Sequence, residues 1–223
     1  MNYFGQQVRF SGRKFRFKNA VYALDSTIIT LCAEVYDWAH YTHSKGAVKL
    51  HTLLNFSTLL PEYVHITDGK AGDNTAARHV QVKPGSIVVS DRGYFDTRLL
   101  NFWDSTKVFF VVRVKDNLIY ERMEERDLPD NAHPEVLIDE IVILKGNGTA
   151  RQYPRPIRRI AVYNARHDFT IELLTNNMKL SAGTIAGLYK ARWDVEVFFR
   201  NLKQNFHIKS FVGTSSNAVE IQI

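Results

Sequence analysis

Residues 19–34 read NAVYALDSTIITLCAE, and this stretch decides the fold of the chain. Its β-branched and apolar residues predict a strand that is buried inside a sheet. One acid, Asp25, interrupts the apolar run. A carboxylate in such a strand is costly unless it is paired or binds a metal ion, so Asp25 is a candidate functional residue.

The segments that follow extend this strand into a sheet. Their apolar patterns predict further strands at residues 48–54, 63–67, 86–90 and 108–114. Helices are predicted between these strands, at residues 73–80, with Asp73 as a possible N-cap, and at residues 97–104. Antiparallel strands followed by alternating helix and strand indicate an α/β fold with a mixed sheet flanked by helices.

Asp91 is a second acid that stands next to an apolar strand. It comes directly after the apolar strand SIVVS, residues 86–90. The ends of such strands are where α/β sheets place ligand-binding and catalytic groups. Asp91 is therefore a second candidate.

Residues 116 to about 180 break the alternation of strand and helix. They combine acids, four prolines and short strands predicted at residues 137–144, 157–163 and 169–175. We interpret them as a β-rich insertion. The predicted organisation is a first part of the core at 1–115, the insertion at 116–180, and a last part with a long helix at 181–223.

Composition excludes several classes of protein. With 223 residues and 45% hydrophobic residues, the chain can form a sizeable core, which excludes a disordered tail, a collagen-like repeat and a disulfide scaffold. The chain has a single cysteine, Cys32, which cannot form an internal disulfide and fits a protein of the reducing cytosol. We expect Cys32 to be a small residue of the core. The sequence lacks a run of about 20 apolar residues and starts without the apolar stretch of a signal peptide.

The charge distribution favours a polyanionic partner. The net charge is +6 and the pI about 9.4, which alone is common among many classes of protein. Two runs, at residues 9–18 and 151–166, each hold five cations and no acid. Either run can be an ordinary solvated face, but two of them in one chain favour nucleic acid.

Residues 189–203, YKARWDVEVFFRNLK, carry the most chemical information. They belong to a helix predicted from about residue 181 to residue 206. At about 100° per residue, four of its polar side chains lie within about 60° of one another, namely Tyr189, Arg192, Glu196 and Lys203. Taken alone, this is equally an amphipathic helix with an Arg192–Glu196 ion pair.

Asp25, Asp91 and Glu196 together favour a metal-dependent site. Three carboxylates from two strand positions and one helix can hold two divalent cations, and oxygen ligands suit Mg²⁺ or Mn²⁺. Two such ions activate a hydroxyl nucleophile and stabilise the leaving oxygen in phosphoryl transfer.

The order of these motifs resembles a known family. The spacing Y-x2-R-x3-E-x6-K at residues 189–203 is similar to the signature of the DDE transposases of insertion-sequence family four, which are bacterial cut-and-paste enzymes. YALDST (22–27) and VSDRGY (89–94) resemble the first and second aspartate motifs of that family. KGAVKLH (45–51) and LLTNN (173–177) extend the similarity over essentially the whole chain.

The resemblance implies a ribonuclease H-like core whose β-rich insertion precedes the last catalytic helix. It implies that two Mg²⁺ or Mn²⁺ ions are held by Asp25, Asp91 and Glu196. It also implies contacts to DNA from Tyr189, Arg192, Trp193, Lys203 and Arg92. The implied activity is cleavage and strand transfer at transposon ends. The implied partners are double-stranded DNA, at transposon ends and target, and a second copy in the synaptic complex, in the bacterial cytoplasm at the nucleoid.

Two alternative functions remain open, and the sequence departs from the family at two points. The alternatives are a ribonuclease H-like nuclease or resolvase without strand transfer, and a truncated, inactive DNA-binding remnant. The insertion lacks the tryptophan that some relatives use to stabilise a flipped base, so Tyr153, Tyr163 or Phe169 would have to replace it. The chain is also short for the family, and we expect a core truncated at both ends, with a helix start at Asn217 and Glu220.

Other candidate sites are weaker. Three histidines, His40, His43 and His51, lack a companion cysteine and match no standard zinc spacing. The Gly-Asn-Gly at residues 146–148 predicts a turn, because no GK[ST] follows it as in a phosphate-binding loop.

Overall fold

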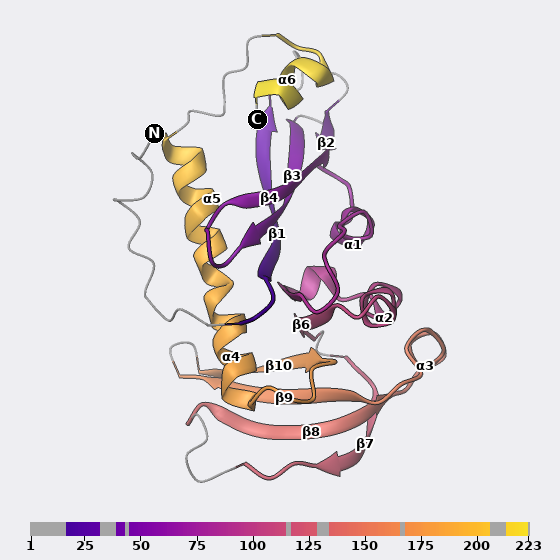
Figure 1. Ribbon diagram of the computed structural model, residues 1–223. Coiled ribbons are helices and arrows are strands. Elements are labelled where there is room, and N and C mark those ends of the chain that lie inside the picture. Colours follow the sequence, from indigo (N-terminus) through magenta and orange to yellow (C-terminus); the bar gives the residue numbers. More distant parts are fainter. Residues whose placement is uncertain are drawn as a thin grey trace.

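The computed structural model describes residues 17–31, 39–42, 45–114, 117–128, 134–165, 168–205 and 213–222. Cys32, His43, Phe206 and the first basic run up to residue 16 lie outside these ranges. Within them, the chain forms a ten-stranded sheet of order β2-β3-β1-β5-β6-β10-β9-β8-β7, with β4 pairing with β3 (Figure 1). The strands are β1 (Val21–Leu31), β2 (His40–Thr42), β3 (Lys45–Asn55), β4 (Pro61–Asp68), β5 (Ile87–Ser90), β6 (Phe109–Arg113), β7 (Tyr120–Glu125), β8 (Val136–Leu144), β9 (Ile157–Asn164) and β10 (Phe169–Thr175).

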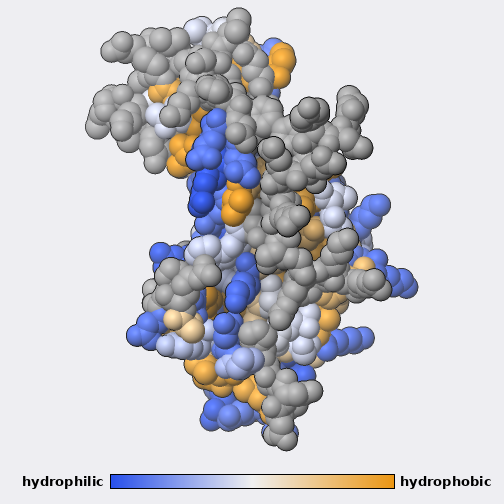
Figure 2. All heavy atoms as spheres, turned by 90° about the vertical axis from the view of Figure 1, so that its left-hand side faces the viewer, coloured by the Kyte–Doolittle hydropathy of each residue, from blue (hydrophilic) through white to orange (hydrophobic). Residues whose placement is uncertain are grey.

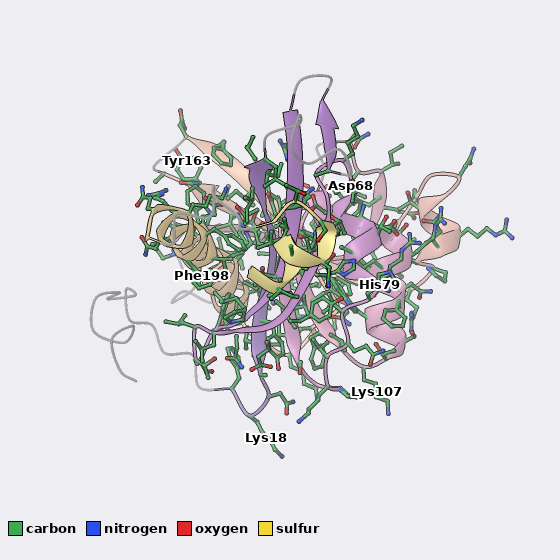
Figure 3. The ribbon with its side chains drawn as sticks, turned by 90° about the horizontal axis from the view of Figure 1, so that it is seen from above. Lys18, Asp68, His79, Lys107, Tyr163 and Phe198 are labelled. Carbon is green, nitrogen blue, oxygen red and sulfur yellow. The ribbon has the colours of Figure 1, made fainter. Side chains whose placement is uncertain are left out.

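Helices cover both faces of this sheet. Figure 1 shows α4 and α5 along one face, and α1, α2 and α3 along the other. Seen from above, Phe198 of α5 and His79, just after α1, lie on opposite sides of the upright strands (Figure 3). The helices are α1 (Asp73–Ala77), a 3-10 turn η1 (Arg92–Tyr94), α2 (Thr97–Ser105), α3 (Thr149–Gln152), α4 (Ala182–Ala191), α5 (Trp193–Asn205) and α6 (Ser216–Gln222).

Strand β1 lies inside the sheet, between β3 and β5, as its apolar sequence predicts. It pairs antiparallel with β3 and parallel with β5. Its side chains alternate between the faces: Tyr22 and Leu24 join the core under α1 and α2, whereas Val21 and Ala23 pack toward α4 and α5. Both faces of β1 are therefore buried, which explains why its sequence is an almost continuous apolar run.

Strands β7 to β10 continue the same sheet. Strand β10 pairs antiparallel with β6, and β9, β8 and β7 follow in order. Two buried arginines of β9 bridge these strands: Arg158 pairs with Asp139 at 2.6 Å, and Arg159 with Glu140 at 2.6 Å and with Glu172 at 2.7 Å. The arginines of the second basic run thus include two that serve as internal cross-links.

Three helix boundaries differ from those expected. The first helix is only Asp73–Ala77 and its N-cap is Gly72, because the Asp73 carboxylate is bonded to other strands. The long helix breaks at Arg192 into α4 and α5.

The third difference is at α6, where the Ser215 hydroxyl accepts from the Ala218 N–H at 3.2 Å and Glu220 accepts from Ser216, so the expected Asn217–Glu220 cap is not formed. Among the described residues, the helices are too short or too polar to cross a membrane.

Candidate active site

The parallel register of β1 and β5 places two acids side by side. Leu24 pairs with Ser90, and these are the residues immediately before Asp25 and Asp91. Because side chains alternate along a strand, Asp25 lies on the same face as Val21 and Ala23, toward α4 and α5. Asp91 thus directly follows the end of β5, and Asp25 lies within β1 just past the last residue that pairs with β5, beneath the break between the two helices.

Asp25 is largely buried, and its pKa is raised well above the usual value of a carboxyl group. Its Oδ1 accepts the backbone N–H of Ser26 at 2.8 Å, and its Oδ2 lies 2.9 Å from Nη1 of Arg192. Burial raises the pKa of Asp25 to about 6; Arg192 opposes this rise, and the charges of Asp91 and Glu196 add to it. The three carboxylates therefore repel one another.

Arg192 holds this group of acids together. Only 4% of it is exposed, and its guanidinium donates to Asp25 at 2.9 Å and to Oε1 of Glu196 at 3.1 Å. The guanidinium carbon also lies 5.6 Å from the centre of the Tyr189 ring. Burial alone would lower the pKa of Arg192, but the charge of Asp25 and its neighbours outweighs burial and raises it. Arg192 is thus a fixed cation between two carboxylates.

Tyr189 reaches the second strand acid from α4. Its hydroxyl donates to Oδ1 of Asp91 at 3.3 Å, and burial raises the pKa of Tyr189. Asp91 also accepts the backbone N–H of Arg92 at 2.6 Å and so begins the turn η1. The break at Arg192 leaves Tyr189 on α4 and Glu196 on α5, so both helices contribute to the site.

The remaining predicted site residues lie at the rim or farther away. Glu196 is 44% exposed, and Arg92 and Trp193 are also exposed. Figure 2 shows hydrophilic and hydrophobic side chains next to one another on this side of the molecule. Lys203 lies seven residues beyond Glu196, roughly 10 Å along α5, and makes no ion pair with a described residue; partial burial lowers its pKa. The structure therefore does not bring Lys203 to the acids.

A pocket of about 330 Å³ opens next to Tyr189. Its walls come from β9, β10, α4 and the start of α5, and they include Tyr163, Lys190 and Trp193. Of the three aromatic residues considered for the insertion, Tyr163 lines this pocket, whereas Tyr153 is buried in the core on the other face. Trp193 and Tyr189 thus line the same pocket.

The carboxylates do not converge on one point as they stand. Within the part of the chain that the structure describes, no group of three or more acids, histidines or cysteines could hold a metal ion. Arg192 occupies the space between Asp25 and Glu196. Cation binding at this site would therefore have to compete with the Arg192 ion pairs.

Sequence reasoning missed a second polar cluster, on the other face of β1. Asp73 binds the Ser26 hydroxyl at 2.8 Å and Lys49 at 2.8 Å, with His51 at 3.5 Å. His51 is fully buried, and burial lowers its pKa to about 4, so it is a neutral core histidine and not a zinc ligand. The signal lay in KGAVKLH, where Lys49 and His51 are two residues apart and so share one face of a strand.

Comparison with known families agrees with this arrangement. Residues 16–223 match the family described as "Transposase DDE domain". A putative transposase of Sinorhizobium fredii (y4zB) is 33% identical over 202 residues, which are 90% of this chain and 56% of that protein. A probable transposase for insertion sequence element IS5377 of Geobacillus stearothermophilus is 30% identical over 215 residues, 96% of this chain and 56% of the relative. The chain thus spans about half the length of these relatives.

A solved structure shares the fold at low sequence identity. It is the piggyBac transposase in a synaptic complex with hairpin DNA, with a TM-score of 0.54 and 10% identity, and the match covers 92% of this chain and 44% of that chain. This likeness confirms the predicted ribonuclease H-like fold class, with its large mixed sheet flanked by helices.

Proposed function

This chain belongs to the DDE transposase family, and on that basis we propose that it is the catalytic domain that cleaves DNA at transposon ends and joins them to target DNA. One observation carries the proposal: Asp25 and Asp91, 66 residues apart in sequence, follow the last paired residues of the parallel strands β1 and β5, and Asp25 shares its neighbourhood with Arg192 and Glu196. A largely buried carboxyl group whose pKa is raised by burial and by neighbouring acids, as at Asp25, is typical of a functional site.

We propose Asp25, Asp91 and Glu196 as the ligands of two Mg²⁺ or Mn²⁺ ions. Their oxygen donors fit such ions, and the rise in the pKa of Asp25 caused partly by Asp91 and Glu196 is the repulsion that a divalent cation would relieve. When bound, the two ions would activate the attacking hydroxyl and stabilise the leaving oxygen. Transposases of the DDE family generally use divalent metal ions, which agrees with this assignment.

The chain's own side chains would orient the acids and the DNA. The Tyr189 hydroxyl fixes Oδ1 of Asp91, and Arg192 fixes Oδ2 of Asp25. The buried Nε–H of Arg192 has no hydrogen-bond partner among the described residues. Arg92 on η1 and Trp193 and Lys203 on α5 are exposed, and we place the DNA backbone along these residues.

The partners and the organisation of the whole protein follow from this proposal. We propose double-stranded DNA as the substrate, a second copy of the chain in the synaptic complex, and action at the nucleoid. We propose residues 116–180 as the β-rich insertion of the core, supported by four strands and the helix α3 in the described part of this range. Pairing of β10 with β6 joins the insertion directly to the core sheet.

The test is cleavage and joining of DNA that carries the element's terminal repeats, read from the sequence flanking the gene. In Mn²⁺ the protein is expected to nick the repeat end and join it to target DNA. Asp25→Asn and Glu196→Gln should each lose activity by more than the roughly 100-fold typical of losing a supporting residue. Glu220→Gln, a change of another exposed helical acid, is the control and should retain activity.

Three outcomes distinguish the alternatives. Nicked DNA without joined product would indicate a ribonuclease H-like nuclease or resolvase. Salt-sensitive DNA binding without any Mn²⁺-dependent cleavage would indicate a DNA-binding remnant. Equal cleavage by the protein and by Glu196→Gln would show that the activity does not belong to this site.

A further inference from the structure

We infer that Asp73 is a positioning residue that holds the carboxylates of Asp25, within β1, and Asp91, after β5, in place from the opposite face of the sheet. The inference rests on the proposed function, because it assigns Asp73 to the support of that site. Asp73 begins α1, between β4 and β5. It contacts the residue next to Asp25 and the turn that follows Asp91, and touches neither carboxylate itself.

The first contact is with β1. Ser26 directly follows Asp25, and because side chains alternate along the strand, it points to the α1 face while Asp25 points to the α5 face. The Ser26 hydroxyl donates to Oδ1 of Asp73 at 2.8 Å. Ser26 also lies opposite His51 in the β1–β3 register. Asp73 thus fixes the backbone of β1 one residue beyond the buried acid.

The second contact is with the turn η1. A Cβ atom at Gly93 would lie 3.1 Å from Oδ2 of Asp73, so the turn packs directly on this carboxylate. The neighbouring side chain, Asn74, lies 3.1 Å from the carbonyl oxygen of Gly93 and 3.0 Å from that of Tyr94, and it donates to both when its amide nitrogen faces them. Asp91 begins this turn. The first residues of α1 therefore contact the turn η1, which Asp91 begins.

Neighbouring polar side chains balance the charge of Asp73, whose side chain is 22% exposed. Lys49 lies 2.8 Å from Oδ1 and also donates to the Ala71 carbonyl at 3.4 Å. His51 approaches the same oxygen at 3.5 Å and the Tyr94 hydroxyl at 3.5 Å, while its Nε2 lies 3.0 Å from the Thr67 hydroxyl. Lys49 therefore balances the Asp73 charge, and the neutral His51 ties the cluster to β4 and to η1.

This arrangement explains how three acids that repel one another keep their places. Repulsion among Asp25, Asp91 and Glu196 favours a movement of β1 away from the end of β5. Bonds to Ser26 and packing on Gly93 oppose this movement from the far face, where they leave the acids free to bind other groups. Outer residues of this kind commonly change metal affinity or activity by 10–100-fold when they are lost.

The experiment measures Mn²⁺ affinity by titration calorimetry of the DNA-free protein, together with thermal unfolding. Asp73→Ala is expected to weaken Mn²⁺ binding by about 10–100-fold, and Ser26→Ala by less. The double variant should bind no more weakly than Asp73→Ala, because the two residues act through one bond. Asp104→Ala is the matched control: Asp104 is equally exposed, at 22%, and it likewise pairs with a cation, Arg155, but it lies on α2.

Each result supports or overturns the inference. A folded Asp73→Ala protein with unchanged Mn²⁺ affinity would overturn it. An equal loss of affinity in Asp104→Ala would overturn it too, because the effect would then be general destabilisation. If Asp73→Ala does not fold, Ser26→Ala decides the matter alone, and unchanged affinity in that variant counts against the inference. Asp25→Asn tests the underlying site separately, since loss of binding there with no effect at Asp73 overturns only the positioning role.

Discussion

Replacing Asp25 with asparagine should stabilise the metal-free protein at neutral pH. Burial and the two neighbouring acids raise the pKa of Asp25 from 3.8 to about 6. The folded protein therefore holds this proton more tightly than the unfolded chain does. Below about pH 4 the carboxyl is neutral in both states; as the pH rises to about 6 only the folded state still holds the proton, so stability falls. Above about pH 6 the full cost of the buried charge remains.

The size of this cost follows from the shift in pKa. About two pH units at 1.36 kcal/mol each correspond to roughly 3 kcal/mol. Asparagine has the shape of the protonated carboxyl and carries no charge, so Asp25→Asn should gain about this amount at pH 8 and almost nothing at pH 4. For a chain of this length, we expect the midpoint of thermal unfolding to rise by about 6–12 °C at pH 8.

Unfolding in EDTA at pH 4, 6 and 8 measures this gap. Saturating Mn²⁺ provides the second arm: it should stabilise the wild-type protein and not the variant, which reverses their order. A gap that does not change with pH, or a wild-type protein that is the more stable one at pH 8 in EDTA, would refute the reasoning. Such a result would mean that the attraction of Arg192 stabilises the charged form of Asp25 by more than burial destabilises it.

Two further variants test the packing and the DNA-binding surface. Arg158→Ala should lower the free energy of unfolding by about 3–5 kcal/mol, because it leaves the buried Asp139 with only the more distant cation Arg126, at 3.9 Å. In urea denaturation, Arg158→Met combined with Asp139→Leu should recover most of this loss, and an Arg158→Ala variant as stable as wild type would contradict the prediction. Trp193→Ala should leave unfolding within about 0.5 kcal/mol of wild type, since Trp193 is exposed. The same change should weaken binding to DNA with an unpaired end by about 1–3 kcal/mol in fluorescence anisotropy, whereas an equal loss in Val197→Ala, on the same exposed stretch of α5, would argue against stacking.

Much of the fold could be predicted because the strands are buried on both faces. β1, β5 and β6 have apolar sequences that only an interior sheet explains, and the acids that end or interrupt them stand out against that background. The nearness of Asp25 and Asp91 follows from the parallel pairing of β1 with β5. Strand pairing at long range depends on the whole chain, so their distance was not readable from spacing alone.

Other features depend on tertiary contacts that leave little trace in local patterns. The helix is interrupted at Arg192, whose side chain bonds Asp25 and Glu196, and helical periodicity shows neither the interruption nor these contacts. Asp73 has the position of a helix cap, but its carboxylate serves Ser26 and Lys49, which are far away in sequence. The ideal helical wheel placed Lys203 beside the other polar residues, although two turns of rise separate it from Glu196.

The ion pair between Asp25 and Arg192 can form only late in the synthesis of the chain. These residues are 167 positions apart. At about 5–20 residues per second, the ribosome needs roughly 8–33 seconds to make the stretch between them. During that interval the Asp25 carboxylate lacks its cation, because Arg192 has not yet been made. A product that stops before α5 lacks Glu196, so it never assembles the three carboxylates of the proposed site.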